Sequence, residues 1–307
     1  MDKSGHFRSK LDSASRATTK TLAEDYLQSL RIRGRSDSHL HNLEAVLRGY
    51  QRAAPELTHP GVPRQTEDWL AEHVHLMPST RNRMLVMVKG LAKWALRHER
   101  ISKNPLAKVE LVKVPESIPP QFTVEELRTM VNAWGDPYHL RACVSVYTGM
   151  RISESGALES EKIDRAGRVI DVTGKGGKQR IIPIQAELAA ILDAYGTLPP
   201  GALFPTRKAN AWSEFADFIA RIGLTRGERS PHSTRHSYAG IITATGMPSI
   251  LLAAHMGHSS QETTAHYAQL AGRYSTAVAG WPRGEMQLLL GASSPFPPLP
   301  PPKPQPS

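Results

Sequence analysis

Apolar residues recur at helical spacing along the first third of the chain. Over residues 22–30, leucines and a tyrosine follow an i, i+4, i+8 pattern, and the same spacing returns over 40–47. The widest apolar stripe runs from Ser79, a candidate N-cap, to about His98. This pattern predicts a small all-α domain over residues 19–110.

Proline and glycine punctuate the rest of the chain. The prolines of 111–122 predict an extended linker, because proline removes a backbone donor and restricts the residue before it. Two short apolar runs, 168–172 and 179–184, flank six residues rich in glycine and lysine and predict a β-hairpin with a glycine-rich tip. Thr123, with Glu126 three residues on, predicts a capping box where a second domain begins. Helices are expected near residues 124–134, 138–148, 185–194, 210–222, 232–244, 248–256 and 260–270.

The fold class that follows is mainly α, with a small β-hairpin or sheet in the second half. The chain is expected to divide into a flexible polar tail (1–18), the helical domain (19–110), the linker (111–122), a second domain (123–290) and a proline-rich tail (291–307). Eight prolines fall within residues 295–307, so this last part is expected to be disordered.

Length and composition exclude several classes of protein. The 307 residues are 40% hydrophobic, which is enough for two domains with cores of their own. No apolar run approaches the ~20 residues of a membrane span, and the N-terminus lacks the apolar segment of a signal peptide. The single cysteine, Cys143, excludes an internal disulfide and argues against a cysteine-rich zinc site. We therefore expect a protein of the reducing cytoplasm.

Positive charge is the first indication of a partner. The formal net charge is +10 and the pI is about 9.8, a balance typical of proteins that bind a polyanion. Residues 1–115 hold 20 Lys and Arg against 12 Asp and Glu, whereas the rest of the chain holds 18 against 16. The helix expected over 79–98 has basic residues and no acidic one, which favours DNA phosphate contact over an ordinary solvated face. Its candidate DNA-binding residues are Arg81, Arg83, Lys89, Lys93 and Arg97.

Five polar motifs in the second half carry candidate chemistry. Arg151 stands at a helix boundary marked by glycine, and Lys175 lies between glycines at the hairpin tip. His232 and Arg235 are spaced i, i+3 and so share one helix face. His258 follows a glycine that ends a helix, and Tyr267 lies nine residues beyond it.

Taken singly, these motifs have ordinary structural explanations. The spacings of His232 with His236 and of His255 with His258 are those of metal-ligand pairs, but no carboxylate or cysteine completes a credible set. Residues 241–267 also resemble a helix-turn-helix, an interpretation that leaves the arginine and lysine motifs before them unexplained.

Together and in this order, the motifs resemble those of the tyrosine recombinase (phage integrase) family. TGMRISE, TGKGGKQR, HSTRH, MGHSS and TTAHY match that family's motifs, and the resemblance covers nearly the whole chain. It implies a helical, SAM-like core-binding domain followed by an α+β catalytic domain, in a compact Xer- or Cre-like arrangement without a separate arm-binding domain. It also implies an active site formed by Arg151, Lys175, His232, Arg235, His258 and Tyr267, with Glu154 as a supporting acid.

These residue types suit phosphodiester transfer without a metal ion or ATP. The phenol of Tyr267 can form a phosphotyrosine that leaves again, and the ammonium of Lys175 can protonate the departing 5′ oxygen. Arg151 and Arg235 are permanently charged forks for the non-bridging oxygens. The two histidines can accept or donate protons near pH 7. No cofactor and no metal is expected.

The resemblance also implies the partners. They are double-stranded DNA carrying a recombination site and further copies of the chain, in a homotetramer that exchanges strands through a Holliday junction. An accessory recombinase or a directionality protein can join this complex, no membrane is involved, and the expected location is the cytoplasm, at the nucleoid. The apolar segment 268–290 is a candidate for packing either into a neighbouring protomer or onto its own domain.

Other functions stay open at this point. A DNA-binding protein with a relict active site would have the same motifs without covalent chemistry. A nickase of the type IB topoisomerase kind would use the same chemistry without exchanging partners, and a metal-dependent nuclease is the most distant alternative.

Overall fold

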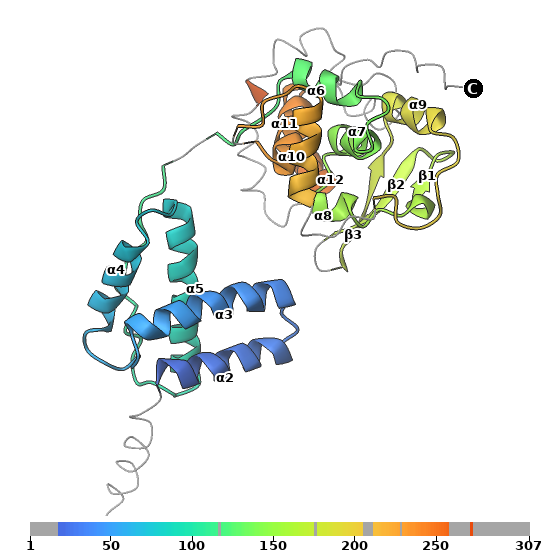
Figure 1. Ribbon diagram of the computed structural model, residues 1–307. Helices are drawn as coiled ribbons and strands as arrows, with labels where there is room; N and C mark the ends of the chain where they lie inside the picture. The colour runs from blue at the N-terminus through green and yellow to red at the C-terminus, as the bar shows by residue number, and fades with distance from the viewer. Residues whose placement is uncertain are drawn as a thin grey trace, which may run out of the picture. The chain divides into compact units, whose positions relative to one another are not determined.

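The structure, a computed structural model, describes residues 18–115, 118–174, 177–204, 211–227, 229–257 and 271–272. The chain separates into two compact units, Met1–Glu116 and Ser117–Ser307 (Figure 1). Each unit has a hydrophobic core of its own. This division falls inside the segment 111–122, where the sequence predicts a linker. The finer division into five parts stays a prediction. Among the described residues, no helix has the length and apolar character needed to cross a bilayer.

The described part of the first unit is helical. Its elements are α2 (Thr19–Ile32), α3 (Asp37–Ala53), α4 (Val62–Glu72) and α5 (Pro78–Arg97). Helices α2, α3 and α5 contact one another and bury the predicted apolar stripes, as at Leu43 and Val88, while α4 packs on α3. Helix α5 begins at Pro78 with Met77 as its N-cap, so the prediction of Ser79 as the N-cap was wrong. Proline favours the first helical position because its fixed φ suits the helix and its missing N–H has no helical acceptor there.

The second unit combines helices with a small sheet. Its helices are α6 (Val124–Val131), α7 (His139–Thr148), α8 (Ile152–Ser155), α9 (Ala186–Ala194), α10 (Ala211–Arg221), α11 (Pro231–Ala244) and α12 (Ser249–Met256). The predicted capping box begins α6: Thr123 Oγ1 accepts the Glu126 N–H at 3.2 Å, and the Glu126 carboxylate accepts the Thr123 N–H at 2.9 Å. The helix expected over 260–270 lies outside the described residues.

The sheet contains the predicted hairpin and one further short strand. Strands β1 (Ile163–Asp164), β2 (Val169–Thr173) and β3 (Gln179–Pro183) lie in the order β1-β2-β3, and both pairs are antiparallel. In the hairpin, Val169 is opposite Pro183 and Thr173 is opposite Gln179. The sequence did not predict β1, because a strand of two residues is too short to show an alternating pattern. The fold is otherwise the predicted one, mainly α with a small sheet.

Helix α7 lies at the centre of the second unit and contacts α6, α8, α9 and α11 (Figure 1). Helix α11 is buried along most of its length, with Tyr238, Ala239 and Ile242 in the core. Helix α11 also contacts α12, which in turn contacts β3. This packing brings the end of α7, the start of α8, strand β3, the first part of α11 and the end of α12 together, and the candidate site is built from these five pieces.

Candidate active site

Two glycines in the left-handed region end the helices that border the site. Gly149 (φ 62°) ends α7 and Gly257 (φ 65°) ends α12. A Cβ atom on Gly149 would overlap the ring of Tyr238, so both the backbone angle and the available space require glycine there. The turn at Gly149 places Arg151 at the N-cap of α8, the helix boundary that the sequence predicts.

Arg151 is held by Glu154, one turn further along α8. Its Nη1 donates to Glu154 Oε1 at 2.8 Å, and its backbone N–H donates to Oε2 at 2.8 Å. The Glu154 side chain is 3% exposed, whereas that of Arg151 is 29% exposed. The carboxylate therefore fixes the guanidinium from the buried side and leaves part of it open to solvent.

Arg235 reaches the same place from α11. Its side chain is buried, and it donates to the Gly149 carbonyl at 2.8 Å and to the Met256 carbonyl at 2.6 Å. Arg151 also donates to the Met256 carbonyl, at 3.4 Å, and to the Gly257 carbonyl at 3.1 Å. Two guanidiniums from distant parts of the sequence thus converge on one carbonyl oxygen at the end of α12.

Arg180 on β3 forms, with Arg151 and Arg235, what we call the arginine cluster. Its Nη1 and Nη2 donate to the two carboxylate oxygens of Glu154, at 3.1 and 2.8 Å, and its Nε donates to the His255 carbonyl at 2.9 Å. Three successive carbonyls at the end of α12 accept hydrogen bonds from the cluster. The last carbonyls of a helix lack helical partners and carry the negative end of its dipole, so they suit guanidinium groups.

Sequence analysis did not single out Arg180. It lies two residues before the buried Ile182 on β3, so both side chains face the same side of the sheet. A charged side chain on the inward face of a half-buried strand needs a partner. The two-residue spacing of Arg180 from the apolar Ile182 in a predicted strand is therefore the sequence signal that could have identified Arg180.

Glu154 is anionic in this environment. Burial by itself would raise the pKa of its carboxyl, but the hydrogen bonds from Arg180 and Arg151 outweigh burial and lower the pKa to about 2. The carboxylate therefore balances part of the positive charge of the arginine cluster at any pH near neutral.

His232 lies in the first turn of α11, near the arginine cluster. Ser230 caps this turn by accepting the His232 N–H at 3.2 Å. His232 is partly open to solvent, and its ring lies edge-on to that of Trp212 with 6.4 Å between centroids. Partial burial, followed by the charges of Arg235 and Arg151, lowers the pKa of His232. The neutral imidazole, which can accept a proton, therefore predominates at neutral pH.

His255 has a structural role in the described part of the chain. Its Nε2 lies 2.6 Å from the Tyr238 hydroxyl, and the two rings are stacked with centroids 5.6 Å apart. Burial, followed by the charges of Arg180 and Arg235, lowers the pKa of His255 to about 4. Within the described ranges no group of three or more side chains has the make-up of a metal site.

Part of the predicted active site falls within the described residues. The structure brings together Arg151, Glu154, His232 and Arg235, whereas Lys175, His258 and Tyr267 lie outside the described residues. The residues before two of these do contact the cluster: a Cβ on Gly174 would lie 3.3 Å from Glu154 Oε1, and one on Gly257 would lie 3.1 Å from Arg180 Nη1. Lys175 and His258 thus follow directly, in sequence, after positions packed against the cluster.

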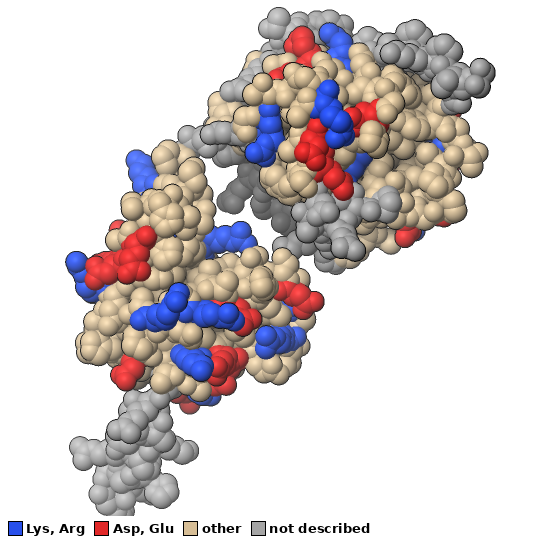
Figure 2. Space-filling model, in the orientation of Figure 1, with Lys and Arg blue, Asp and Glu red and all other residues tan. Residues whose placement is uncertain are grey.

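The predicted DNA-binding residues of α5 differ in exposure. Arg83, Lys93 and Arg97 are exposed, and Arg81 and Lys89 are half-buried. On the face shown in Figure 2, basic and acidic side chains lie interspersed on both units. In the part of the chain that the structure describes, none of the five forms an ion pair, whereas several other arginines do. Their contact with DNA stays a prediction.

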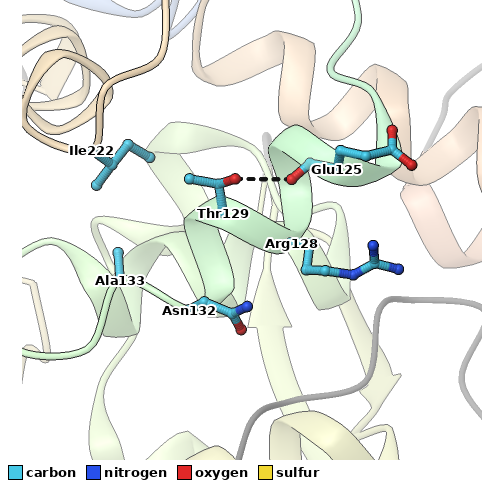
Figure 3. Close-up of a pocket in the computed structure, with 6 residues that line it drawn as sticks. All are labelled: Glu125, Arg128, Thr129, Asn132, Ala133 and Ile222. Carbon is cyan, nitrogen blue, oxygen red and sulfur yellow. Dashed lines mark hydrogen bonds between the residues drawn. The ribbon is translucent and has the colours of Figure 1, made fainter.

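A pocket of about 580 Å³ lies beside α6 (Figure 3). Its lining residues are Glu125, Arg128, Thr129, Asn132, Ala133 and Ile222. Thr129 Oγ1 donates to the Glu125 carbonyl at 3.0 Å, and the side chains of Glu125 and Arg128 extend away from Ile222. None of these residues belongs to the arginine cluster or to the predicted active site, so the pocket is separate from the candidate site.

The architecture of the chain is that of the integrases. A lambda integrase dimer bound to a COC′ core site superimposes with a TM-score of 0.69 at 15% identity, covering 87% of this chain and 81% of that chain. The Tn1549 transposon integrase in complex with a circular intermediate DNA superimposes with a TM-score of 0.65 at 18% identity, covering 80% and 94%. These likenesses define the fold class.

The sequence comparisons define the family. Residues 121–273 match the model of the phage integrase family. Tyrosine recombinase XerC of Myxococcus xanthus is 30% identical over an alignment of 217 residues, and the match covers 63% of this chain and 72% of that protein. Tyrosine recombinase XerD of Corynebacterium glutamicum is 30% identical over an alignment of 218 residues, and the match covers 64% of this chain and 71% of that protein. The chain belongs to the tyrosine recombinase (phage integrase) family.

Proposed function

We propose that the chain is a site-specific DNA recombinase that cleaves and rejoins double-stranded DNA through Tyr267. The convergence of the Arg151 and Arg235 guanidiniums on the Met256 carbonyl carries this proposal. Two planar forks that meet at one oxygen are placed to bind the non-bridging oxygens of one phosphate. The family membership supports the assignment of the nucleophile.

In the cleavage step, the phenolic oxygen of Tyr267 attacks the scissile phosphorus and the bond to the 5′ oxygen breaks. The products are a 3′-phosphotyrosine and a 5′-hydroxyl. Neutral His232 accepts the phenolic proton, and the ammonium of Lys175 donates a proton to the departing 5′ oxygen. Arg151 and Arg235 stabilise the charge that develops on the non-bridging oxygens, and His258 donates a further hydrogen bond there.

Rejoining reverses these steps. A 5′-hydroxyl attacks the phosphotyrosine, the tyrosine leaves, and the two proton transfers run backwards. The energy of the broken phosphodiester bond is conserved in the phosphotyrosine bond, so rejoining needs no ATP. When the attacking hydroxyl comes from a second duplex, the strands exchange and a Holliday junction forms.

The proposal extends to the assembly and its location. A lambda integrase of the same fold has been solved as a tetramer bound to a Holliday junction, and this supports a homotetramer on DNA for the present chain. We place the basic face of α5 on the DNA backbone and the reaction at the nucleoid, in the cytoplasm. An accessory recombinase or a directionality protein would set the outcome as integration, excision or resolution.

A covalent trap tests the proposed reaction. Duplexes selected for binding from a random library are nicked beside the bound site, so that cleavage releases a short fragment and prevents rejoining. Wild type is expected to give a protein–DNA band on a denaturing gel in the presence of EDTA. Tyr267→Phe is expected to give none, because it lacks the nucleophilic oxygen, and Tyr274→Phe serves as the matched control that should keep the band.

Other outcomes would support the alternatives. Tight binding of the duplex without any band from wild type would indicate a DNA-binding protein with a relict site. Relaxation of plasmids that lack a selected site would indicate a nickase of the type IB topoisomerase kind. A band that requires magnesium would indicate a metal-dependent nuclease.

A further inference from the structure

Arg180 joins three elements of the second unit through one guanidinium. From β3 it donates to both carboxylate oxygens of Glu154 on α8 and to the His255 carbonyl on α12. The side chains of Arg180 and Glu154 are 11% and 3% exposed, so solvent screens this pair little. Because all the donors belong to one planar group, a shift of any of the three elements strains the bonds to the other two.

Two glycines pack against this ion pair. A Cβ at Gly174 would lie 3.3 Å from Glu154 Oε1 and 3.4 Å from Arg180 Nη1. A Cβ at Gly257 would lie 3.1 Å from Arg180 Nη1 and 3.3 Å from its Cζ. The start of the hairpin tip and the residue after α12 therefore both pack against the Arg180 guanidinium. In the sequence, these two glycines directly precede Lys175 and His258.

We propose that Arg180 is a positioning residue for recombination: it fixes Glu154, which fixes Arg151, and it fixes the end of α12 on which Arg151 and Arg235 converge. The inference rests on the proposed function. Arg180 acts through these groups and not on the reacting atoms. Its removal leaves each candidate catalytic residue in the chain and alters where the guanidinium of Arg151 and the end of α12 lie.

Lysine cannot replace Arg180 in this role. An ammonium keeps the charge, but it is a single nitrogen, and it cannot donate to both oxygens of Glu154 and to the His255 carbonyl in the fixed directions of a guanidinium. With lysine at this position, Glu154 would lose one of the two hydrogen bonds that Arg180 donates to it, while its carboxylate stays buried. A displacement of about 1 Å in a group that positions the reacting atoms can lower a rate on the order of 100-fold.

The test separates the rate of cleavage from DNA affinity. Arg180→Lys and Arg180→Gln are compared with wild type for the single-turnover rate of covalent adduct formation, the DNA concentration at half-saturation and the urea midpoint. We expect adduct formation to slow by about 10- to 100-fold in both variants, with half-saturation changed by no more than about 2-fold.

Arg221 provides the matched control. It forms a two-pronged ion pair with Asp136, at 2.7 and 2.9 Å, in the same unit and away from the cluster. Arg221→Lys weakens this ion pair, so it is expected to lower the urea midpoint slightly. It is expected to leave the rate of adduct formation within about 2-fold of wild type. Wild-type rates for folded Arg180→Lys and Arg180→Gln would overturn the proposal, as would rate losses no larger than that of Arg221→Lys.

A double-mutant cycle of Arg180→Gln and Glu154→Gln distinguishes failure of this inference from failure of the proposed function. If Arg180 fixes Glu154, the effects of the two substitutions on the unfolding equilibrium constant deviate from additivity by at least about threefold. Additive effects would overturn the inference whether or not wild type cleaves DNA. If wild type forms no adduct while the coupling persists, the proposed function fails and the fixing of Glu154 by Arg180 stands.

Discussion

Single residues in the candidate site have charges that are set by their neighbours. Glu154 keeps a negative charge because arginines donate hydrogen bonds to its carboxylate, whereas burial, followed by the same positive charge, lowers the pKa values of His255 and His232. The site thus combines fixed cations, one fixed anion and histidines with lowered pKa values. Such a combination suits the proposed phosphate ligand, because it pairs fixed cations with an imidazole able to accept a proton at neutral pH.

His255 makes the folded state sensitive to mild acid. Its pKa is about 4 in the folded protein and about 6.5 when unfolded, so between these values the unfolded chain binds more protons. We expect the contribution of His255 to the free energy of unfolding to be fully present above pH 6.5 and to be lost as the pH drops towards 4. The expected contribution is about 1–2 kcal/mol, less than the full shift would give, because part of the ring still contacts solvent.

Urea unfolding at pH 7, 5.5 and 4.5 measures this effect. His255→Gln should be less stable than wild type at pH 7, because it loses the stacking and hydrogen bond with Tyr238, and its stability should depend less on pH. His41→Gln, at an exposed position of α3, should keep the wild-type pH dependence. Equal pH dependence in all three proteins would contradict the assignment of the effect to His255.

The sequence predicts the residues of the site better than it predicts their partners. The contact of Arg151 with Glu154 follows from their spacing, since three residues along a helix lie on one face. The acceptors of Arg235 could not be predicted, because they are backbone carbonyls at Gly149 and Met256 that only the fold brings near. Every residue has a backbone carbonyl, so the sequence does not show which carbonyls the packing will make available as acceptors.

Elements contribute to the site through their ends. The last turn of α7, the first turns of α8 and α11 and the last turn of α12 meet there, and helix ends carry the backbone groups that lack helical partners. Glycine, proline and capping residues mark these ends in the sequence, so most were predicted to within one or two residues. Strand β1 could not be predicted because two residues show no period. The start of α5 differs from the prediction because Pro78 occupies the first helical position, so Ser79 lies inside the helix.

The turn after α7 tests this account of the helix ends. Gly149→Ala should destabilise the protein by about 3 kcal/mol or more, because a Cβ is disfavoured at φ 62° and would also displace the Tyr238 ring. Gly223→Ala is the matched control: its φ is 75°, but nothing lies within 4 Å of a Cβ there, so about 1 kcal/mol is expected.

Urea unfolding of both variants gives the comparison. A larger loss for Gly149→Ala shows that the turn and the core residue Tyr238 are packed together. Equal losses for the two variants would mean that Tyr238 moves away at no cost, and that the end of α7 is held less firmly than the contacts indicate.

The whole molecule divides its charge unevenly between its two halves. Residues 1–115 hold an excess of basic over acidic residues, 20 against 12, whereas the rest of the chain is close to balance at 18 against 16. In the second unit several arginines are engaged within the fold, as in the pairs of Arg180 with Glu154 and Arg221 with Asp136. The charge available for long-range attraction of DNA therefore lies mainly in the first unit, whereas several arginines of the second unit are paired with carboxylates within its fold.

This division predicts where the salt dependence of DNA binding originates. Each phosphate contact releases condensed counterions and adds about 0.9 to the slope of log K against log salt. Replacing both Lys93 and Arg97 on α5 with glutamine should therefore lower the slope by about 2 and weaken binding similarly at all DNA sequences. Arg64→Gln on α4 removes one positive charge, from a guanidinium already paired with Asp68 at 3.0 Å, so it should leave the slope nearly unchanged. If all these variants show the wild-type slope, the exposed basic residues of α5 face solvent and the first unit binds DNA by another surface.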